Sequence, residues 1–134
     1  MDTKKLHSLF ASSAGVSIDT RRISKDEIYF SLKGDNFDGN KFALEAIKKG
    51  AKFSVVDDIK LKNANDKIIY VEDTLKSLQE LSNYHRSIFD TKVIGITGSN
   101  GKTTTKNLIY SILSQSYGVI KTKGNLNNHI GVPI

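Results

Sequence analysis

The residues best placed to do chemistry lie in one short glycine-rich segment, residues 97–104, with the sequence T-G-S-N-G-K-T-T. Glycines let a backbone approach oxygen atoms closely, and amides at the start of a helix attract anions. Gly98, Gly101 and Lys102 supply the two glycines and the lysine that a phosphate-binding loop uses around the β- and γ-phosphates of a nucleotide. The segment is therefore predicted to bind nucleotide phosphates.

The residues after the lysine extend this interpretation. Thr103 is placed to join the shell of a Mg²⁺ ion that bridges the phosphates, and Thr104 adds a second donor. The general pattern G-x-x-x-x-G-K-[ST] requires glycine at position 96, where this sequence has Ile96, so the loop is a shorter variant. The alternative is a chance glycine turn before a helix, and the preceding strand pattern and the paired threonines argue against it.

The loop needs a strand before it and a helix after it. Residues 92–97 form a continuous apolar and β-branched run, which predicts a parallel strand buried on both faces. A helix over 102–115, a strand over 117–121 and a polar loop over 122–129 complete the pattern. A second domain, 91–134, is therefore predicted to be the start of a P-loop domain.

The preceding 90 residues alternate between strand and helix patterns. Strands are predicted over 27–32, 52–56 and 67–71, and a short helix over 3–10. Asp38 is placed to cap a helix over 40–49, and Asp73 one over 74–89. The fold class is α/β: a small amino-terminal α/β domain, 1–90, followed by the first β-P-loop-α-β unit of a parallel-sheet ATPase domain.

Composition excludes several functions. The chain of 134 residues has 38% hydrophobic and 25% charged residues, as in globular proteins. The absence of cysteine excludes disulfides, thiolate metal sites and a cysteine nucleophile. The net charge of +6 is scattered among acidic residues, so we expect no nucleic-acid partner. No leader or membrane-length apolar run is found, which favours a cytoplasmic protein without a membrane span.

Four ordered segments resemble the Mur ligases, which build the peptide stem of bacterial cell-wall precursors. V-I-G-I-T-G-S-N-G-K-T-T-T-K, residues 93–106, is similar to their ATP loop, whose T-G-x-x-G-K-T-[TS] form lacks the extra glycine. The other three segments resemble the member that adds D-alanyl-D-alanine to UDP-N-acetylmuramoyl-tripeptide. They are D-T-R-R from Asp19, I-Y-F-S-L-K-G-D-N-F-D-G-N-K-F over 28–42, and G-N-L-N-N-H-I-G-V-P over 124–133.

The resemblance implies an ATP-dependent amide ligase of peptidoglycan synthesis that works through an acyl phosphate, with ATP and Mg²⁺ as cofactors. Lys102 would be catalytic and Thr103 would face the metal. The nucleotide would be bound by Gly98, Ser99, Asn100, Gly101, Lys102, Thr103 and Thr104. The partners UDP-N-acetylmuramoyl-tripeptide and D-alanyl-D-alanine would be met by Thr20, Arg21, Asp35, Asn36, Phe37, Asn125, Asn127 and Asn128.

Other interpretations stay open. The Asp and Asn residues of these motifs could be turn formers, His7 and His85 are expected on helix surfaces, and His129 is ambiguous. Thr20 stands where the family often has serine, and Asn40 where it often has histidine. The chain is expected to be an inactive amino-terminal fragment, since the acidic metal ligand, modified lysine and adenine-binding groups of the family are missing. The competing functions are another ligase of this superfamily, such as one adding glutamate to folate, and a non-catalytic nucleotide-binding module.

Overall fold

The computed structural model describes residues 1–122, 128, 130, 131 and 133. Its chain divides into two compact units, made up chiefly of Met1–Phe89 and of Asp90–Val132. Each unit is described by itself. None of the helices in the described part of the chain is long and apolar enough to cross a membrane.

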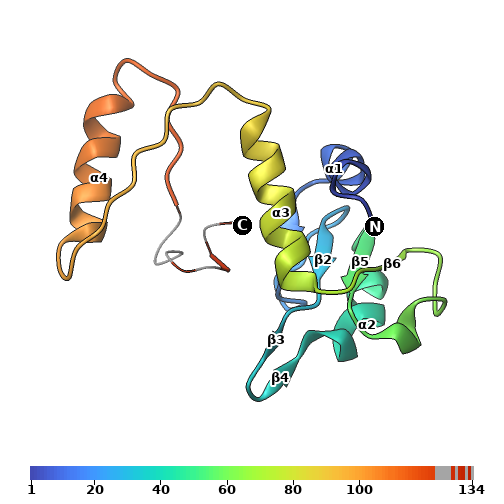
Figure 1. Ribbon diagram of the computed structural model, residues 1–134. Helices are drawn as coiled ribbons and strands as arrows, with labels where there is room; N and C mark the ends of the chain where they lie inside the picture. Colours follow the sequence, from blue (N-terminus) through green and yellow to red (C-terminus); the bar gives the residue numbers. More distant parts are fainter. Residues whose placement is uncertain (123–127, 129, 132, 134) are drawn as a thin grey trace. The chain divides into compact units, whose positions relative to one another are not determined.

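The first unit contains a four-stranded parallel sheet with the strand order β1-β2-β5-β6 (Figure 1). Three of its strands confirm the predicted ones, and β1 was not predicted because it spans only two residues. The strands are β1 (Val16–Ser17), β2 (Ile28–Phe30), β5 (Phe53–Val56) and β6 (Ile68–Tyr70). The α/β class with a parallel sheet is thereby confirmed.

The three predicted helices of this unit are also present, and both predicted capping aspartates accept a backbone hydrogen bond. The Asp73 side chain accepts a hydrogen bond from the Lys76 amide at the start of α3. Asp38 accepts one from the Asn40 amide, but the turn that it caps is a 3₁₀ turn, Gly39–Phe42. The α-helix begins only after that turn, at Ala43. The helices are α1 (Thr3–Ala11), α2 (Ala43–Lys48) and α3 (Thr74–Ser87), and a second 3₁₀ turn spans Ile59–Leu61.

Both faces of the sheet are covered. On one face, Tyr29 of β2 packs with Ala46 of α2, and Val56 of β5 packs with Ala43. Successive strand residues point to opposite faces, so the fully buried Phe30 faces the other side. There α3 contacts β2, and α1 packs on α3. This two-sided core positions the loops at the strand ends.

A short antiparallel hairpin follows β2, formed by β3 (Lys33–Gly34) and β4 (Phe37–Asp38). Gly39 lies directly after it, and its amide donates to the Leu32 carbonyl at 2.9 Å. A Cβ on Gly39 would lie 2.6 Å from that carbonyl oxygen, so only glycine fits where the hairpin returns to the sheet.

The second unit differs from the prediction. Its helix α4 (Lys102–Leu113) confirms the predicted helix, but residues 92–97 and 117–121 form no strand. Val93 is 70% and Ile120 94% exposed. A parallel strand needs neighbours to satisfy its backbone and cover its side chains, and the described part of this unit provides none. Instead the segment after α4 is tied to the helix, with Lys106 donating to the Thr122 carbonyl at 2.8 Å.

Candidate functional site

The glycine-rich loop of the second unit has the backbone that phosphate binding requires. Gly98 and Gly101 adopt φ values of +142° and +77°, which side chains with a Cβ rarely tolerate. Gly101 is the N-cap of α4 and has no side chain to occupy the helix start. Amides of a first helical turn have no partner within the helix, so those of α4 can donate to an anion. The loop and helix together form an anion-binding geometry.

Lys102 places its ammonium group over this loop. Its Nζ donates to the carbonyl oxygens of Gly98 and Ser99. Thr103 and Thr104 are exposed in the first turn of α4, and Asn100 is exposed in the loop. Every predicted nucleotide-binding residue therefore lies on one continuous loop-to-helix segment, with a single positive charge folded back onto it.

Among the described residues, no acidic metal site lies at the loop. Across the residues that the structure describes, no group of three or more His, Cys, Asp or Glu side chains is placed to hold a metal ion. A single protein ligand such as the Thr103 hydroxyl suits an ion whose other ligands are mostly water and phosphate oxygens, which is how Mg²⁺ commonly binds beside nucleotides.

In the first unit, the D-T-R motif follows β1 and forms a tight local pair. Asp19 accepts from the Arg21 amide at 3.0 Å and forms an ion pair with the Arg21 guanidinium at 2.7 Å. This hydrogen bonding holds the pKa of Asp19 well below its usual range and raises that of Arg21. The Arg21 side chain is 85% exposed, whereas Thr20 is buried and its carbonyl accepts from Lys49 at 3.2 Å.

The predicted residues Asp35, Asn36 and Phe37 are exposed and are called the hairpin tip here; Asp35 and Asn36 form the turn, and Phe37 is the first residue of β4. They line a hollow of about 270 Å³ together with the two hairpin legs. Phe37 stacks on Phe42, with ring centroids 5.6 Å apart and planes 9° from parallel. The hollow is lined by two lysines, Lys33 and Lys41, and by two aspartates, Asp35 and Asp38, with the Phe37 ring as its aromatic wall.

Sequence reasoning missed the polar network beneath this hairpin. Ser31 follows β2, Asp57 follows β5, and Thr74 begins α3 after β6. The buried Asn40 hydrogen bonds to Ser31 and to Asp57, and the Thr74 hydroxyl donates to the Ser31 carbonyl at 3.1 Å. All three lie at the carboxyl ends of parallel strands, where ligand-binding groups gather in open α/β sheets. The available signal was the polar residue directly after two of the strands, Ser31 after β2 and Asp57 after β5.

The charges in this network favour ionised carboxylates. Lys33 forms an ion pair of 2.8 Å with Asp57, which raises the Lys33 pKa. Burial raises the pKa of Asp57, but hydrogen bonds from Lys33 and Asn40 outweigh it, and the net shift is downward. The side-chain hydrogen bond from Asn40 lowers the pKa of Asp38 in the same way. The network therefore carries two stable negative charges beside one partly exposed cation.

The asparagine-rich segment is only partly described. Asn125, Asn127 and His129 lie outside the described residues. Asn128 accepts hydrogen bonds from the amides of Ile130 and Gly131 at 3.2 and 2.7 Å, the local pattern of a turn-forming side chain.

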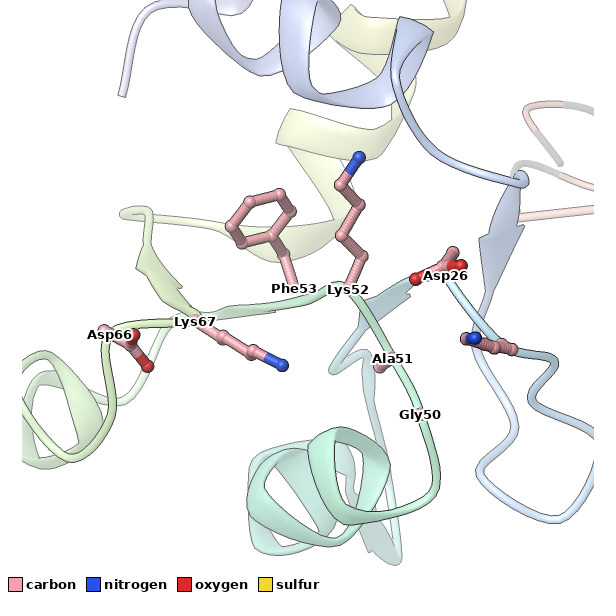
Figure 2. A pocket seen from close by; sticks show the side chains of 8 residues that line it. Asp26, Gly50, Ala51, Lys52, Phe53, Asp66 and Lys67 are labelled. Carbon is pink, nitrogen blue, oxygen red and sulfur yellow. The ribbon is translucent and has the colours of Figure 1, made fainter.

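Two further features lie away from these groups. His7 and His85 join α1 to α3 through a ring-nitrogen contact of 3.1 Å, so they pack against each other as well as lying near the surface. A hollow of about 470 Å³ lies at the amino ends of β5 and β6 and contains no predicted site residue (Figure 2). Lys52 is one of the residues that line it, and in Figure 2 its side chain points toward α1, in agreement with its contacts to Ser12.

Comparison with known families matches the two units separately. Residues 13–86 match the Mur ligase family, catalytic domain, and residues 96–134 match the Mur ligase middle domain. The first match covers more than half of the chain.

Individual relatives agree with the family match. The chain is 44% identical over 122 residues to the UDP-N-acetylmuramoyl-tripeptide--D-alanyl-D-alanine ligase of Bacillus subtilis, covering 90% of this chain and 26% of that protein. The MurF structure of Acinetobacter baumannii superposes with a TM-score of 0.80 at 30% identity, over 98% of this chain and 31% of that one. The MurF ligase of Thermotoga maritima in complex with ADP gives 0.78 at 31% identity, over 90% and 28%. The chain thus spans about a quarter to a third of the length of these relatives.

Proposed function

Because this chain belongs to the Mur ligase family, we propose that it is part of an ATP-dependent ligase that adds D-alanyl-D-alanine to UDP-N-acetylmuramoyl-tripeptide. Residues 1–90 would bind the UDP end of the substrate, and residues 91–134 would begin the ATP-binding domain. The name of the Bacillus subtilis relative supports this choice within the family. The reaction would occur in the cytoplasm, which supplies ATP.

The phosphate loop is the observation that carries the proposal. It presents two glycines at positive φ, the start of a 12-residue helix and one lysine held over the loop. A relative at 31% identity is known in complex with ADP, which supports a nucleotide as the ligand here. The residues from Gly98 to Thr104 would surround the phosphates, as assigned from the sequence.

In the intact enzyme, the carboxylate of the tripeptide would attack the γ-phosphorus of ATP, and the bond to the β-phosphate oxygen would break to release ADP. The D-alanyl-D-alanine amine would then attack the acyl carbon, and inorganic phosphate would leave as the amide forms. Lys102 would stabilise the negative charge of the phosphoryl group in transit. Mg²⁺ would be held by Thr103 and the phosphates, and would supply further charge neutralisation.

The UDP end would be bound by Thr20, Arg21 and the hairpin tip. An ion pair as exposed as that of Arg21 contributes little in water, so its guanidinium can exchange Asp19 for a phosphate at small cost. The aromatic face and the lysines of the hairpin hollow suit a base and a diphosphate. Asn125, Asn127 and Asn128 would contact the substrate in the central domain.

Lysine replacement in the intact enzyme tests this assignment. Lys102→Ala should lower the ligation rate by orders of magnitude and leave calorimetric binding of UDP-N-acetylmuramoyl-tripeptide nearly unchanged, because the lysine serves phosphoryl transfer. Lys121→Ala is the matched control, since Lys121 lies in the same unit but bonds to Asn107. If Lys102→Ala lost both ligation and binding of UDP-N-acetylmuramoyl-tripeptide, the assignment of Lys102 to phosphoryl transfer alone would be contradicted. ATP turnover that does not depend on the UDP substrate would favour another ligase of the superfamily, and nucleotide binding without any turnover would favour a non-catalytic module.

A further inference from the structure

The Asn40 side chain is saturated with hydrogen bonds. It is 4% exposed, and its Oδ1 accepts from Ser31 Oγ at 2.9 Å and from the Asp57 amide at 3.2 Å. Its Nδ2 donates to the carboxylates of Asp38 at 2.9 Å and Asp57 at 2.8 Å. An amide has two acceptor positions and two donor hydrogens, and all four have a partner, although the Ser31 hydroxyl shares its single hydrogen with the Val55 carbonyl. This pattern fixes both the position and the orientation of the group.

Through these bonds Asn40 connects the sheet to both legs of the hairpin. Ser31 and Asp57 stand at the ends of β2 and β5, and Asp38 ends the β4 leg. The β3 leg is held by the ion pair from Lys33 to Asp57, the carboxylate that Asn40 orients. The β4 leg is thus held directly by the Asn40 amide, and the β3 leg is held through the Asp57 carboxylate to which that amide donates.

The held parts line the hollow at the hairpin. Lys33 is about half exposed even while it contacts Asp57, and together with Lys41 and Phe37 it lines the hairpin hollow, which also contains Asp35 and Asp38. A loose hairpin would have to be ordered each time an anion bound, at a cost in conformational entropy. A hairpin fixed in advance avoids that cost.

We infer that Asn40 is a positioning residue, which holds Lys33 and the hairpin tip in the conformation that receives the diphosphate of a UDP-linked substrate. The inference rests on the proposed function for its ligand. The arrangement of the hairpin by Asn40 can be measured without any ligand.

The variant Asn40→Asp keeps the shape and exchanges the donating NH₂ for an oxygen. The new carboxylate would face two others, Asp38 at the end of β4 and Asp57 directly after β5, and the adjacent cation would be Lys33. The hydroxyls of Ser31 and Thr74 also lie nearby. Lys41 and Asp58 would contribute charge at longer range. Repulsion by two carboxylates raises the pKa of the new one. Protonation as the pH falls from 7 to 5 would restore one donor and part of the original arrangement.

The test uses the 134-residue chain labelled with ¹⁵N. At pH 7, Asn40→Asp should increase backbone motion at residues 33–37 and weaken binding of UDP-N-acetylmuramoyl-tripeptide roughly 10- to 100-fold, with partial recovery of both at pH 5. Asn36→Asp places the same charge on the hairpin without touching the network, so its hairpin should stay as ordered as that of the original chain. This control separates ordering from simple charge repulsion of the ligand.

Each outcome decides the inference. A rigid hairpin in Asn40→Asp at pH 7, or substrate affinity equal to the original, overturns it. If Asn40→Asp does not fold, Asp57→Asn replaces it: this variant keeps the acceptor for Asn40, removes the charge that holds Lys33, and should mobilise the β3 leg alone. An unchanged β3 leg would then overturn the inference. If the unmodified chain binds no UDP-substrate while the hairpin still loosens in Asn40→Asp, the proposed function fails and the positioning role is retained for another anion.

Discussion

The two units use similar side chains with different results. Val55 and Val56 lie in a strand with neighbours on both sides and are fully buried, whereas Val93 and Ile94 belong to no strand and are exposed. Helix α3 buries Leu78 and Leu81 within the first unit, whereas α4 in the second unit has no buried residue. A β-branched run therefore forms a strand where partners exist, and a loop's binding geometry can be present without such a core.

The largest expected effect contrasts a leucine in each helix. Leu78→Ala in α3 should destabilise the first unit by about 2–5 kcal/mol, because the side chain is 1% exposed and leaves a cavity. Leu108→Ala in α4 should change stability by less than about 0.5 kcal/mol, since Leu108 is 61% exposed. Urea denaturation followed by resolved amide signals of each unit would measure both. Equal losses would contradict the difference between the units.

A pair of glycines sharpens the comparison. Gly39→Ala should cost the first unit roughly 1–3 kcal/mol, because the new methyl would collide with backbone at Leu32. Gly101→Ala meets open space but must adopt a left-handed φ, which costs about 1–2 kcal/mol in the phosphate loop alone. We therefore expect Gly39→Ala to lower the melting temperature and Gly101→Ala to weaken nucleotide binding. Gly34→Ala, with open space and no positive φ, is the control.

The start of α3 gives a smaller effect. Asp73→Ala removes the hydrogen bond to the Lys76 amide and should cost about 1 kcal/mol in the unfolding of the first unit. Asp73→Asn keeps an oxygen acceptor and should recover most of the loss. A loss that Asp73→Asn does not recover would show that the charge, rather than the cap, is responsible.

The sequence predicted the first unit well because its signals are local. Periodicity gave the strands and helices, and Asp38 and Asp73 marked where two helices begin. The glycines and the lysine of the phosphate loop are also a local signal, and in the structure both glycines have positive φ and Lys102 donates to the loop. The pairings within the Asn40 network could not be predicted, because bonds such as that from Asn40 to Asp57, 17 positions further along the chain, form only when the sheet folds. The prediction of strands over 92–97 and 117–121 was wrong for the same reason, since strand pairing depends on residues elsewhere in the chain.

The smallest expected effect is the pH dependence of the first unit. Asp38 and Asp57 have lowered folded pKa values, so they contribute stability above the unfolded value of about 3.9, and this contribution is lost as the pH falls through the folded pKa. Because both groups are partly exposed, the loss below pH 4 should be under about 1 kcal/mol for Asp57. Urea denaturation from pH 7 to pH 2.5 should show a smaller acid loss in Asp57→Asn. An identical acid loss in that variant would contradict this role.

The most direct test of the account is an NMR titration of the ¹⁵N-labelled chain with two ligands. UDP-N-acetylmuramoyl-tripeptide should shift amide signals of residues 20–21 and 33–37, and ADP with Mg²⁺ should shift those of residues 98–104. The two sets should stay separate, and Lys102→Ala should weaken only the second. If both ligands shift one common set, or if the UDP-substrate leaves residues 33–37 unchanged, the assignment of substrate to the first unit and nucleotide to the second is contradicted.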